Sequence, residues 1–144
     1  MKKVYFACSI RGGRGDAEWY GELVQIAKKY SKVLTEIFAD QKLTPQGMNK
    51  PAQEIWETDL GWIREADAII AEVTNPSLGV GYEIAKAEEW GKPILALYRP
   101  SPERKLSAMI AGSPNVTVFE YTDLPAAEHA VAMFMANVRT HQTI

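Results

Sequence analysis

The sequence predicts an α/β protein with a doubly wound, parallel sheet of five strands. Two observations lead to this fold class. Five short apolar runs alternate along the chain with longer stretches of helical character, and alternation of this kind is typical of parallel sheets covered by helices. The 144 residues contain no internal repeat, low-complexity segment or linker, so they are predicted to form one domain over residues 1–144.

The first half of the chain supplies two strands, a helix and a long loop. A short apolar run predicts a strand over Val4–Ala7, and a second run predicts a strand over Val33–Ile37. Between them, residues Glu18–Lys29 carry apolar side chains at helical spacing. The segment Phe38–Gln53 has no clear period and contains two prolines and a glycine, which predicts a loop.

The second half continues the alternation of helices and strands. Helices are predicted over Glu54–Glu65 and Tyr82–Trp90, with the strand Ala68–Val73 between them. The sequence Gly91-Lys92-Pro93 ends the second of these helices and precedes a further strand. The remaining predicted elements are the strand Ile94–Tyr98, the loop Arg99–Lys105, a short helix Leu106–Ala111, the strand Val116–Tyr121 and the helix Pro125–Arg139.

Composition and charge exclude several classes of protein. The apolar fraction of 47% is enough for a full core, and a formal net charge of −2 with scattered lysine and arginine argues against a polynucleotide-binding surface. One cysteine, Cys8, cannot form an internal disulfide and fits a reducing compartment. The sequence shows no signal peptide or membrane-length apolar segment, so we expect a cytoplasmic protein with no membrane association.

Two glycine-bearing turns follow predicted strands and form the first candidate site. Ser77-Leu78-Gly79-Val80-Gly81-Tyr82-Glu83 lies between a strand and a helix, and Ser9-Ile10-Arg11-Gly12-Gly13-Arg14 follows the first strand. Free backbone N–H groups in such turns favour anions. In doubly wound sheets, ligands bind beyond the carboxyl ends of the strands, so we expect both turns to meet there with the loop Arg99–Lys105.

Two carboxylates are candidates for catalysis. Glu83 is predicted in the first turn of the helix that opens at this crevice, although acids are also common in first turns because they interact with the helix dipole. Asp59 lies where the apolar stripe of Ile55, Trp56, Leu60 and Ile63 crosses the helix, and a carboxylate there is costly unless it is paired or used. The alternative is an aspartate at the stripe edge that reaches solvent or caps a neighbouring element.

A pair of carboxyl groups suggests chemistry at an acetal-like carbon. In glycosidic cleavage, one carboxyl protonates the leaving group and another traps the oxocarbenium-like centre. An N-glycosidic bond poses the same problem with a nucleobase as the leaving group, and a phosphate-holding turn beside the pair indicates a nucleotide. Neither turn has Walker or complete dinucleotide-binding spacing. His129 and His141 form no metal-ligand cluster, so no metal is expected.

Four segments together resemble the 2′-deoxynucleoside 5′-phosphate N-hydrolases of the nucleoside 2-deoxyribosyltransferase superfamily. They are Tyr5–Arg14, Thr58–Trp62, Ala71–Glu83, and Arg99-Pro100 with Leu106–Ile110. The resemblance spans nearly the whole chain. It implies a flavodoxin-like three-layer sandwich, a homodimer, and hydrolysis of deoxyribonucleoside monophosphates to free base and 2-deoxyribose 5-phosphate, without a metal or redox cofactor.

The resemblance also implies roles for individual residues. Glu83 matches the nucleophile that attacks the anomeric carbon, Asp59 the carboxyl that assists near the leaving base and the sugar, and Tyr5 the tyrosine beside them. Ser107 matches a serine that the neighbouring subunit contributes to the phosphate. The residues that match the phosphate- and sugar-binding turns are Ser9, Ile10, Arg11, Gly12, Ser77 and Gly79. One departure is Cys8, where the family tends to have glycine.

Three rival functions stay open at this point. A deoxyribosyltransferase would pass the sugar to a second base, but a nucleoside transferase needs no phosphate pocket. A relative that hydrolyses ribonucleotides such as CMP would use the same chemistry. A non-catalytic nucleotide- or flavin-binding module could share the fold, because fold alone does not determine function.

Overall fold

The computed structural model describes residues 1–9, 17–35 and 50–140. Five parallel strands form one sheet, as the sequence predicts, and their order is β2-β1-β3-β4-β5. The order reverses between β1 and β3, so the carboxyl ends of these two strands border the crevice where ligands bind in doubly wound folds. The strands are β1 (Lys3–Ala7), β2 (Lys32–Val33), β3 (Ala68–Glu72), β4 (Ile94–Tyr98) and β5 (Val116–Glu120).

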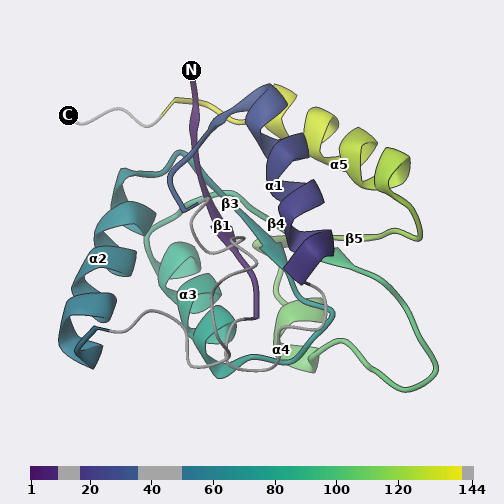
Figure 1. The fold of residues 1–144 in the computed structure, drawn as a ribbon, viewed down its shortest axis with the longest axis horizontal. Coiled ribbons are helices and arrows are strands. Elements are labelled where there is room, and N and C mark those ends of the chain that lie inside the picture. Colours follow the sequence, from purple (N-terminus) through teal and green to yellow (C-terminus); the bar gives the residue numbers. More distant parts are fainter. Residues whose placement is uncertain (10–16, 36–49, 141–144) are drawn as a thin grey trace.

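Helices cover both faces of the sheet and give a three-layer sandwich (Figure 1). Helices α1 (Ala17–Tyr30) and α5 (Leu124–Ala136) pack together on one face, and α2 (Ala52–Glu65) and α3 (Leu78–Glu89) pack together on the other. The short helix α4 (Ala108–Ala111) lies beside β5. Strands β1, β3 and β4 are buried almost throughout, which explains why they appear in the sequence as continuous apolar runs.

The largest difference from the sequence prediction is the start of α3. This helix begins at Leu78, four residues before the predicted Tyr82, because Ser77 is its N-cap and the Ser77 Oγ accepts a hydrogen bond from the Val80 N–H at 3.2 Å. Gly79 and Gly81 therefore lie in the helix, and Glu83 lies in its second turn. The prediction that Glu83 stands in the first turn is wrong, and so is the helix-dipole explanation for it.

The strand predicted over Val33–Ile37 is also shorter than expected. It begins at Lys32 and ends at Val33, and residues 36 and 37 lie outside the described part of the chain. The Thr35 hydroxyl explains the early end. Its Oγ1 accepts from the Phe6 N–H at 2.8 Å and donates to the Phe6 carbonyl at 2.7 Å, so a side chain satisfies two backbone groups of β1 that a longer β2 would pair.

Other element boundaries differ from the predicted ones by one to three residues. Helix α2 begins directly after Pro51, because proline fits the start of a helix. Helix α5 ends at Ala136 rather than Arg139, with the Asn137 side chain donating to the Met133 carbonyl at 3.0 Å. Gly91 follows Trp90, the C-cap of α3, and has a φ of 70°, a conformation that glycine adopts without strain.

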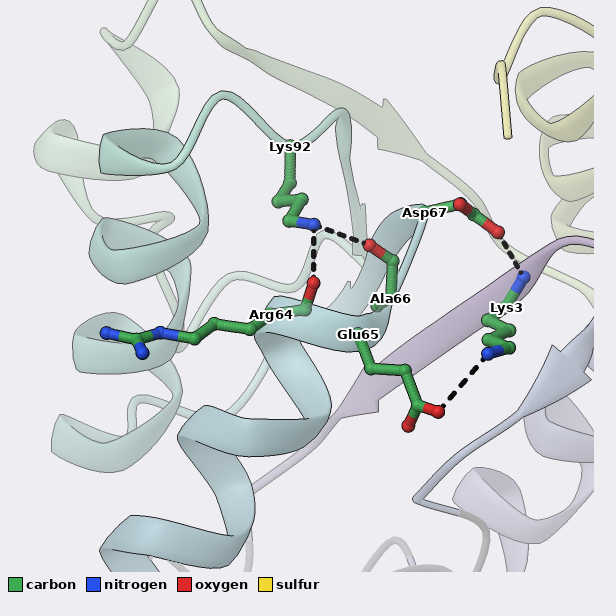
Figure 2. A network of polar contacts seen from close by, with 6 residues as sticks. All are labelled: Lys3, Arg64, Glu65, Ala66, Asp67 and Lys92. Carbon is green, nitrogen blue, oxygen red and sulfur yellow. Dashed lines mark hydrogen bonds and ion pairs between the residues drawn. The ribbon is translucent and has the colours of Figure 1, made fainter. Parts of the chain in front are cut away.

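A polar network fixes the carboxyl end of α2 at the edge of the sheet opposite the crevice (Figure 2). The buried Lys92 Nζ donates to the carbonyls of Arg64 at 2.7 Å and Ala66 at 2.8 Å. Asp67 accepts from the Lys3 backbone N–H at 2.7 Å. Burial lowers the pKa of Lys92. These bonds fix the position of α2 relative to β1, and these two elements carry Asp59 and Tyr5.

Candidate active site

The candidate site lies on the α2/α3 face of the sheet near its carboxyl edge. Tyr5 pairs in register with Ile69 of β3, and both side chains point to this face because in-register neighbours in a parallel sheet share a face. Phe6 pairs with Ile70 and points to the opposite face. The sheet therefore presents Tyr5 to the two helices that carry Asp59 and Glu83.

The predicted catalytic residues Tyr5, Asp59 and Glu83 form one cluster. Tyr5 is completely buried, and its hydroxyl donates a hydrogen bond to Glu83 Oε2. Asp59 lies close enough to Glu83 and Tyr5 for both side chains to shift its pKa. Asp59 Oδ1 is buried and has no hydrogen-bond partner among the described residues. Three elements far apart in the sequence thus bring two carboxyl groups and a phenol together.

Burial raises the pKa of both carboxyl groups. Desolvation is the largest cause for each, and it raises the pKa of Glu83 to about 8 and that of Asp59 to about 6. Their mutual repulsion raises the pKa of Glu83 further, whereas the Tyr5 hydroxyl lowers it by stabilising the carboxylate. The Tyr5 pKa is itself raised well above its usual value, so Tyr5 stays a hydrogen-bond donor. Near neutral pH the two carboxyl groups share about one proton, which is a feature of acid–base pairs.

A cavity of about 210 Å³ opens directly onto the two acids. Trp56 and Tyr82 line it and are 50% and 48% exposed, and the Trp56 Nε1–H donates to the Tyr82 hydroxyl at 3.1 Å. The other lining residues are Ala52, Ile55, Asp59, Leu60, Gly79 and Glu83. A flat apolar ring fits between aromatic and aliphatic walls of this kind.

The aromatic pair was not predicted from the sequence. Trp56 was assigned to the apolar stripe of α2, whereas its exposed side chain instead borders the cavity. Two features of the sequence could have indicated it. Trp56 precedes Asp59 by one helical turn, and Tyr82 is adjacent to Glu83, so both aromatics accompany a candidate acid.

Some of the predicted phosphate-binding residues lie in the described part of the chain. Ser9 follows β1, is completely buried, and its Oγ has no hydrogen-bond partner in the described part of the chain. Ser77 and Gly79 begin α3, where backbone N–H groups point out of the helix. Ile10, Arg11 and Gly12 lie outside the described residues.

Ser107 lies in a second, larger groove. It is exposed, and its Oγ caps α4 by accepting from the Met109 N–H at 3.2 Å. The groove measures about 660 Å³ and is lined by Ser77 and Ser107, with Leu78 and Met109 among its apolar walls. Leu78 is 97% exposed and Met109 83% exposed, which is unusual for large apolar side chains.

Within residues 1–9, 17–35 and 50–140, no three histidine, cysteine or acidic side chains are arranged to hold a metal ion. In the same ranges, no helix is both long enough and apolar enough to cross a membrane.

Comparisons with known proteins agree with this architecture. Residues 4–109 match the family model described as nucleoside 2-deoxyribosyltransferase. A mouse protein named 5-hydroxymethyl-dUMP N-hydrolase is 50% identical over 127 residues, which cover 87% of this chain and 73% of the mouse protein. The human protein of the same name is 42% identical over 127 residues, with the same two coverages of 87% and 73%.

A solved structure is similar in fold. The CMP N-glycosidase of Clostridium botulinum superposes with a TM-score of 0.66, covering 92% of this chain and 99% of that one. At 19% sequence identity, the similarity concerns the fold alone.

Proposed function

The chain belongs to the nucleoside 2-deoxyribosyltransferase family, and from this membership we propose that it hydrolyses the N-glycosidic bond of 2′-deoxynucleoside 5′-monophosphates. The products would be a free nucleobase and 2-deoxyribose 5-phosphate. The observation that carries the proposal is the cluster of Tyr5, Asp59 and Glu83 at the wall of a cavity that fits a flat ring.

The reaction proceeds in two steps with Glu83 as nucleophile. In the first step, a Glu83 carboxylate oxygen bonds to the anomeric carbon, the bond from this carbon to the base nitrogen breaks, and the Asp59 carboxyl donates its proton to the leaving base. In the second step, Asp59 takes a proton from water, the water oxygen bonds to the same carbon, and the Glu83 carboxylate leaves. Both residues thereby return to their starting states.

Tyr5 shifts the proton distribution towards the one that this route needs. Its hydroxyl donates to Glu83 and stabilises the charged form of that group, which lowers the pKa of Glu83. In the free protein Glu83 still has the higher pKa and holds the shared proton, so the route requires this proton to pass to Asp59 before Glu83 attacks. The low polarity that raises both pKa values also strengthens the attraction between a glutamate anion and a developing positive charge on the sugar.

The nucleotide would lie across the switch point with its base and phosphate in separate places. The base fits the cavity beside Trp56 and Tyr82. The 5′-phosphate is expected near Ser9 and the N-terminus of α3, where a buried hydroxyl and free N–H groups face the crevice. Ile10, Arg11 and Gly12 are predicted to contribute to binding of the phosphate and the sugar as well.

The proposed enzyme is a homodimer in which Ser107 reaches the phosphate of the partner subunit. The exposed Leu78 and Met109 beside Ser107 support a subunit contact at this groove. The test mixes a Glu83→Ala chain with a Ser107→Ala chain after each is shown to be impaired. A mixed dimer has one intact site, so activity rises above that of either variant. Confirmed subunit exchange without recovered activity would exclude a contribution across the interface.

The experiment that tests the proposed function measures release of free base by chromatography. Purified protein is incubated with each deoxy- and ribonucleoside monophosphate and with the matching deoxynucleosides. We expect the wild-type protein to release free base from deoxynucleoside monophosphates. Glu83→Gln should release it at least about a thousandfold more slowly. Glu89→Gln should retain normal turnover, because Glu89 is an exposed acid of the same helix.

The same assay separates the rivals. New nucleotides formed after addition of a second free base would indicate a transferase, and equal rates for nucleoside and monophosphate would also favour that function. Faster cleavage of CMP would indicate a ribonucleotide N-hydrolase. A yellow protein that releases no base would indicate a flavin-binding module. A cytoplasmic location stays a prediction from the single cysteine.

A further inference from the structure

Another buried acid lies on the opposite face of the sheet and takes no part in the proposed chemistry. Glu72 is the last residue of β3 and is completely buried. Its Oε1 accepts from the Thr74 backbone N–H at 2.7 Å, and its Oε2 accepts from the Tyr121 hydroxyl. Burial raises the pKa of Glu72, and these two donors lower it. An acid buried at this cost requires an explanation.

The bonds from Glu72 connect four segments at the carboxyl edge of the sheet. The Tyr121 hydroxyl, just after β5, also accepts from Trp19 Nε1 of α1 at 2.7 Å, and the two rings stack with centroids 6.1 Å apart. The Thr74 Oγ1 accepts from the Arg99 N–H, just after β4, at 2.9 Å. We call Trp19, Glu72, Thr74 and Tyr121 the edge brace.

Two further contacts join the same segments. Asn75 Nδ2 donates to the Tyr20 hydroxyl of α1 at 2.8 Å. The guanidinium of Arg99 lies 4.7 Å from the centre of the Trp19 ring. The loop between β3 and α3 is thus held to α1 directly by Asn75 and Tyr20, and indirectly by the path from Thr74 through Arg99 to Trp19.

Ser9 and Ser77, the two described candidates for phosphate binding that flank the crevice, adjoin this brace. Thr74 and Asn75 lead directly to Ser77, which caps α3, and Ser9 follows β1, whose last residue Ala7 pairs with Ala71 next to Glu72. A shift of the loop between β3 and α3 relative to the end of β1 would change the separation of Ser9 and Ser77. Positioning errors of about 1 Å are costly at such sites.

We propose that Glu72 and Tyr121 are positioning residues that hold Ser9 and the start of α3 at the separation required by the 5′-phosphate. The proposal rests on the proposed function, because it takes the phosphate to bind between Ser9 and the start of α3. A role in stability alone predicts something different: loss of the brace would lower the amount of folded protein and leave the preference for a phosphate unchanged.

Tyr121→Phe is the sharpest test, because it removes one hydroxyl and keeps the ring that stacks on Trp19. The matched control is Tyr30→Phe. Tyr30 lies at the far end of α1, and its hydroxyl likewise donates to a glutamate, Glu128, at 2.8 Å. Glu72→Gln is the second variant, since its side-chain oxygen can still accept from Thr74. Thermal melting defines a temperature at which every variant is folded.

Two quantities are measured for each variant. One is the ratio of kcat/KM for a deoxynucleoside monophosphate to kcat/KM for its deoxynucleoside. The other is the Kd for 2-deoxyribose 5-phosphate by calorimetry. We expect Tyr121→Phe to lower the ratio and weaken this binding by about tenfold, Glu72→Gln to do so by less, and Tyr30→Phe to change neither.

An unchanged ratio and Kd in folded Tyr121→Phe would overturn the proposal, as would equal losses for monophosphate and nucleoside. A Tyr30→Phe effect as large as that of Tyr121→Phe would also overturn it, because the effect would then follow from the loss of any tyrosine hydroxyl bonded to a glutamate. If the wild-type protein releases no base from any monophosphate, the proposed function itself has failed, which is a separate result.

Discussion

Glu83 makes the folded protein less stable at alkaline pH, and this cost can be measured. Burial raises the pKa of Glu83 from 4.5 to about 8, so the group stays protonated in the folded chain at pH values where it is ionised in the unfolded chain. The unfolded state therefore releases a proton that the folded state retains. The stability that depends on this proton is complete below the unfolded-state pKa of 4.5, and it is lost as the pH rises through the folded-state pKa of about 8.

The size of this loss follows from the shift. One pKa unit corresponds to about 1.4 kcal/mol, so the shift from 4.5 to about 8 sets an upper limit of about 5 kcal/mol. Because Glu83 retains partial contact with solvent, we expect roughly half of this, about 2 to 3 kcal/mol. Glu83→Gln keeps an acceptor for the Tyr5 hydroxyl and removes the titrating group. The variant is then more stable than wild type at alkaline pH.

The assay is chemical and thermal unfolding of both proteins between about pH 5 and about pH 9. The two stabilities converge near pH 5 and separate at pH 9, where Glu83→Gln melts roughly 5 to 10 °C higher. Glu57→Gln is the control, because Glu57 is an exposed acid on α2 whose loss leaves the pH dependence unchanged. Parallel curves of stability against pH for wild type and Glu83→Gln would refute the argument that burial raises the pKa of this carboxyl.

Three other predictions concern the site and its support. The pH profile of kcat/KM is expected to be bell-shaped with limbs near pH 6 and pH 8, because the pair of acids acts with one proton. In Asp59→Asn the alkaline limb disappears, and the pKa of Glu83 falls because the repulsion from Asp59 is gone. Trp56→Ala raises KM for the monophosphate about tenfold, through lost base stacking, without weakening calorimetric binding of 2-deoxyribose 5-phosphate. Lys92→Met removes the donor of two carbonyls and lowers the free energy of unfolding in urea by about 2 kcal/mol.

The sequence predicted the fold well because parallel strands buried on both faces leave long apolar runs. The strand Ile94–Tyr98 has the predicted bounds, and the five-stranded parallel sheet is confirmed. Errors arose where a side chain replaced a backbone interaction. Ser77 began α3 four residues early by accepting from Val80, and Thr35 replaced part of β2 by bonding to Phe6. Hydropathy contains no signal for either bond.

The candidate site was predicted only in part for a similar reason. Tyr5, Asp59 and Glu83 were selected from motifs, and the structure brings them together. Trp56 was missed because a tryptophan at helical spacing is more often part of a core. Glu72 was missed because its partners, Thr74 and Tyr121, lie two residues and 49 residues away, and only the folded sheet brings them together.

Glu72 on one face of the sheet has its oxygens hydrogen-bonded by the protein, whereas two polar atoms at the crevice do not, and this difference indicates the side from which the ligand binds. On the α1/α5 face, both oxygens of Glu72 accept hydrogen bonds, so this acid is fully satisfied by the protein. At the crevice, Asp59 Oδ1 and Ser9 Oγ are buried without a partner among the described residues. Such groups are costly unless a ligand completes their bonds. A substrate that accepts from Ser9 and interacts with Asp59 would bind across the crevice, with its phosphate and its glycosidic bond at these two points.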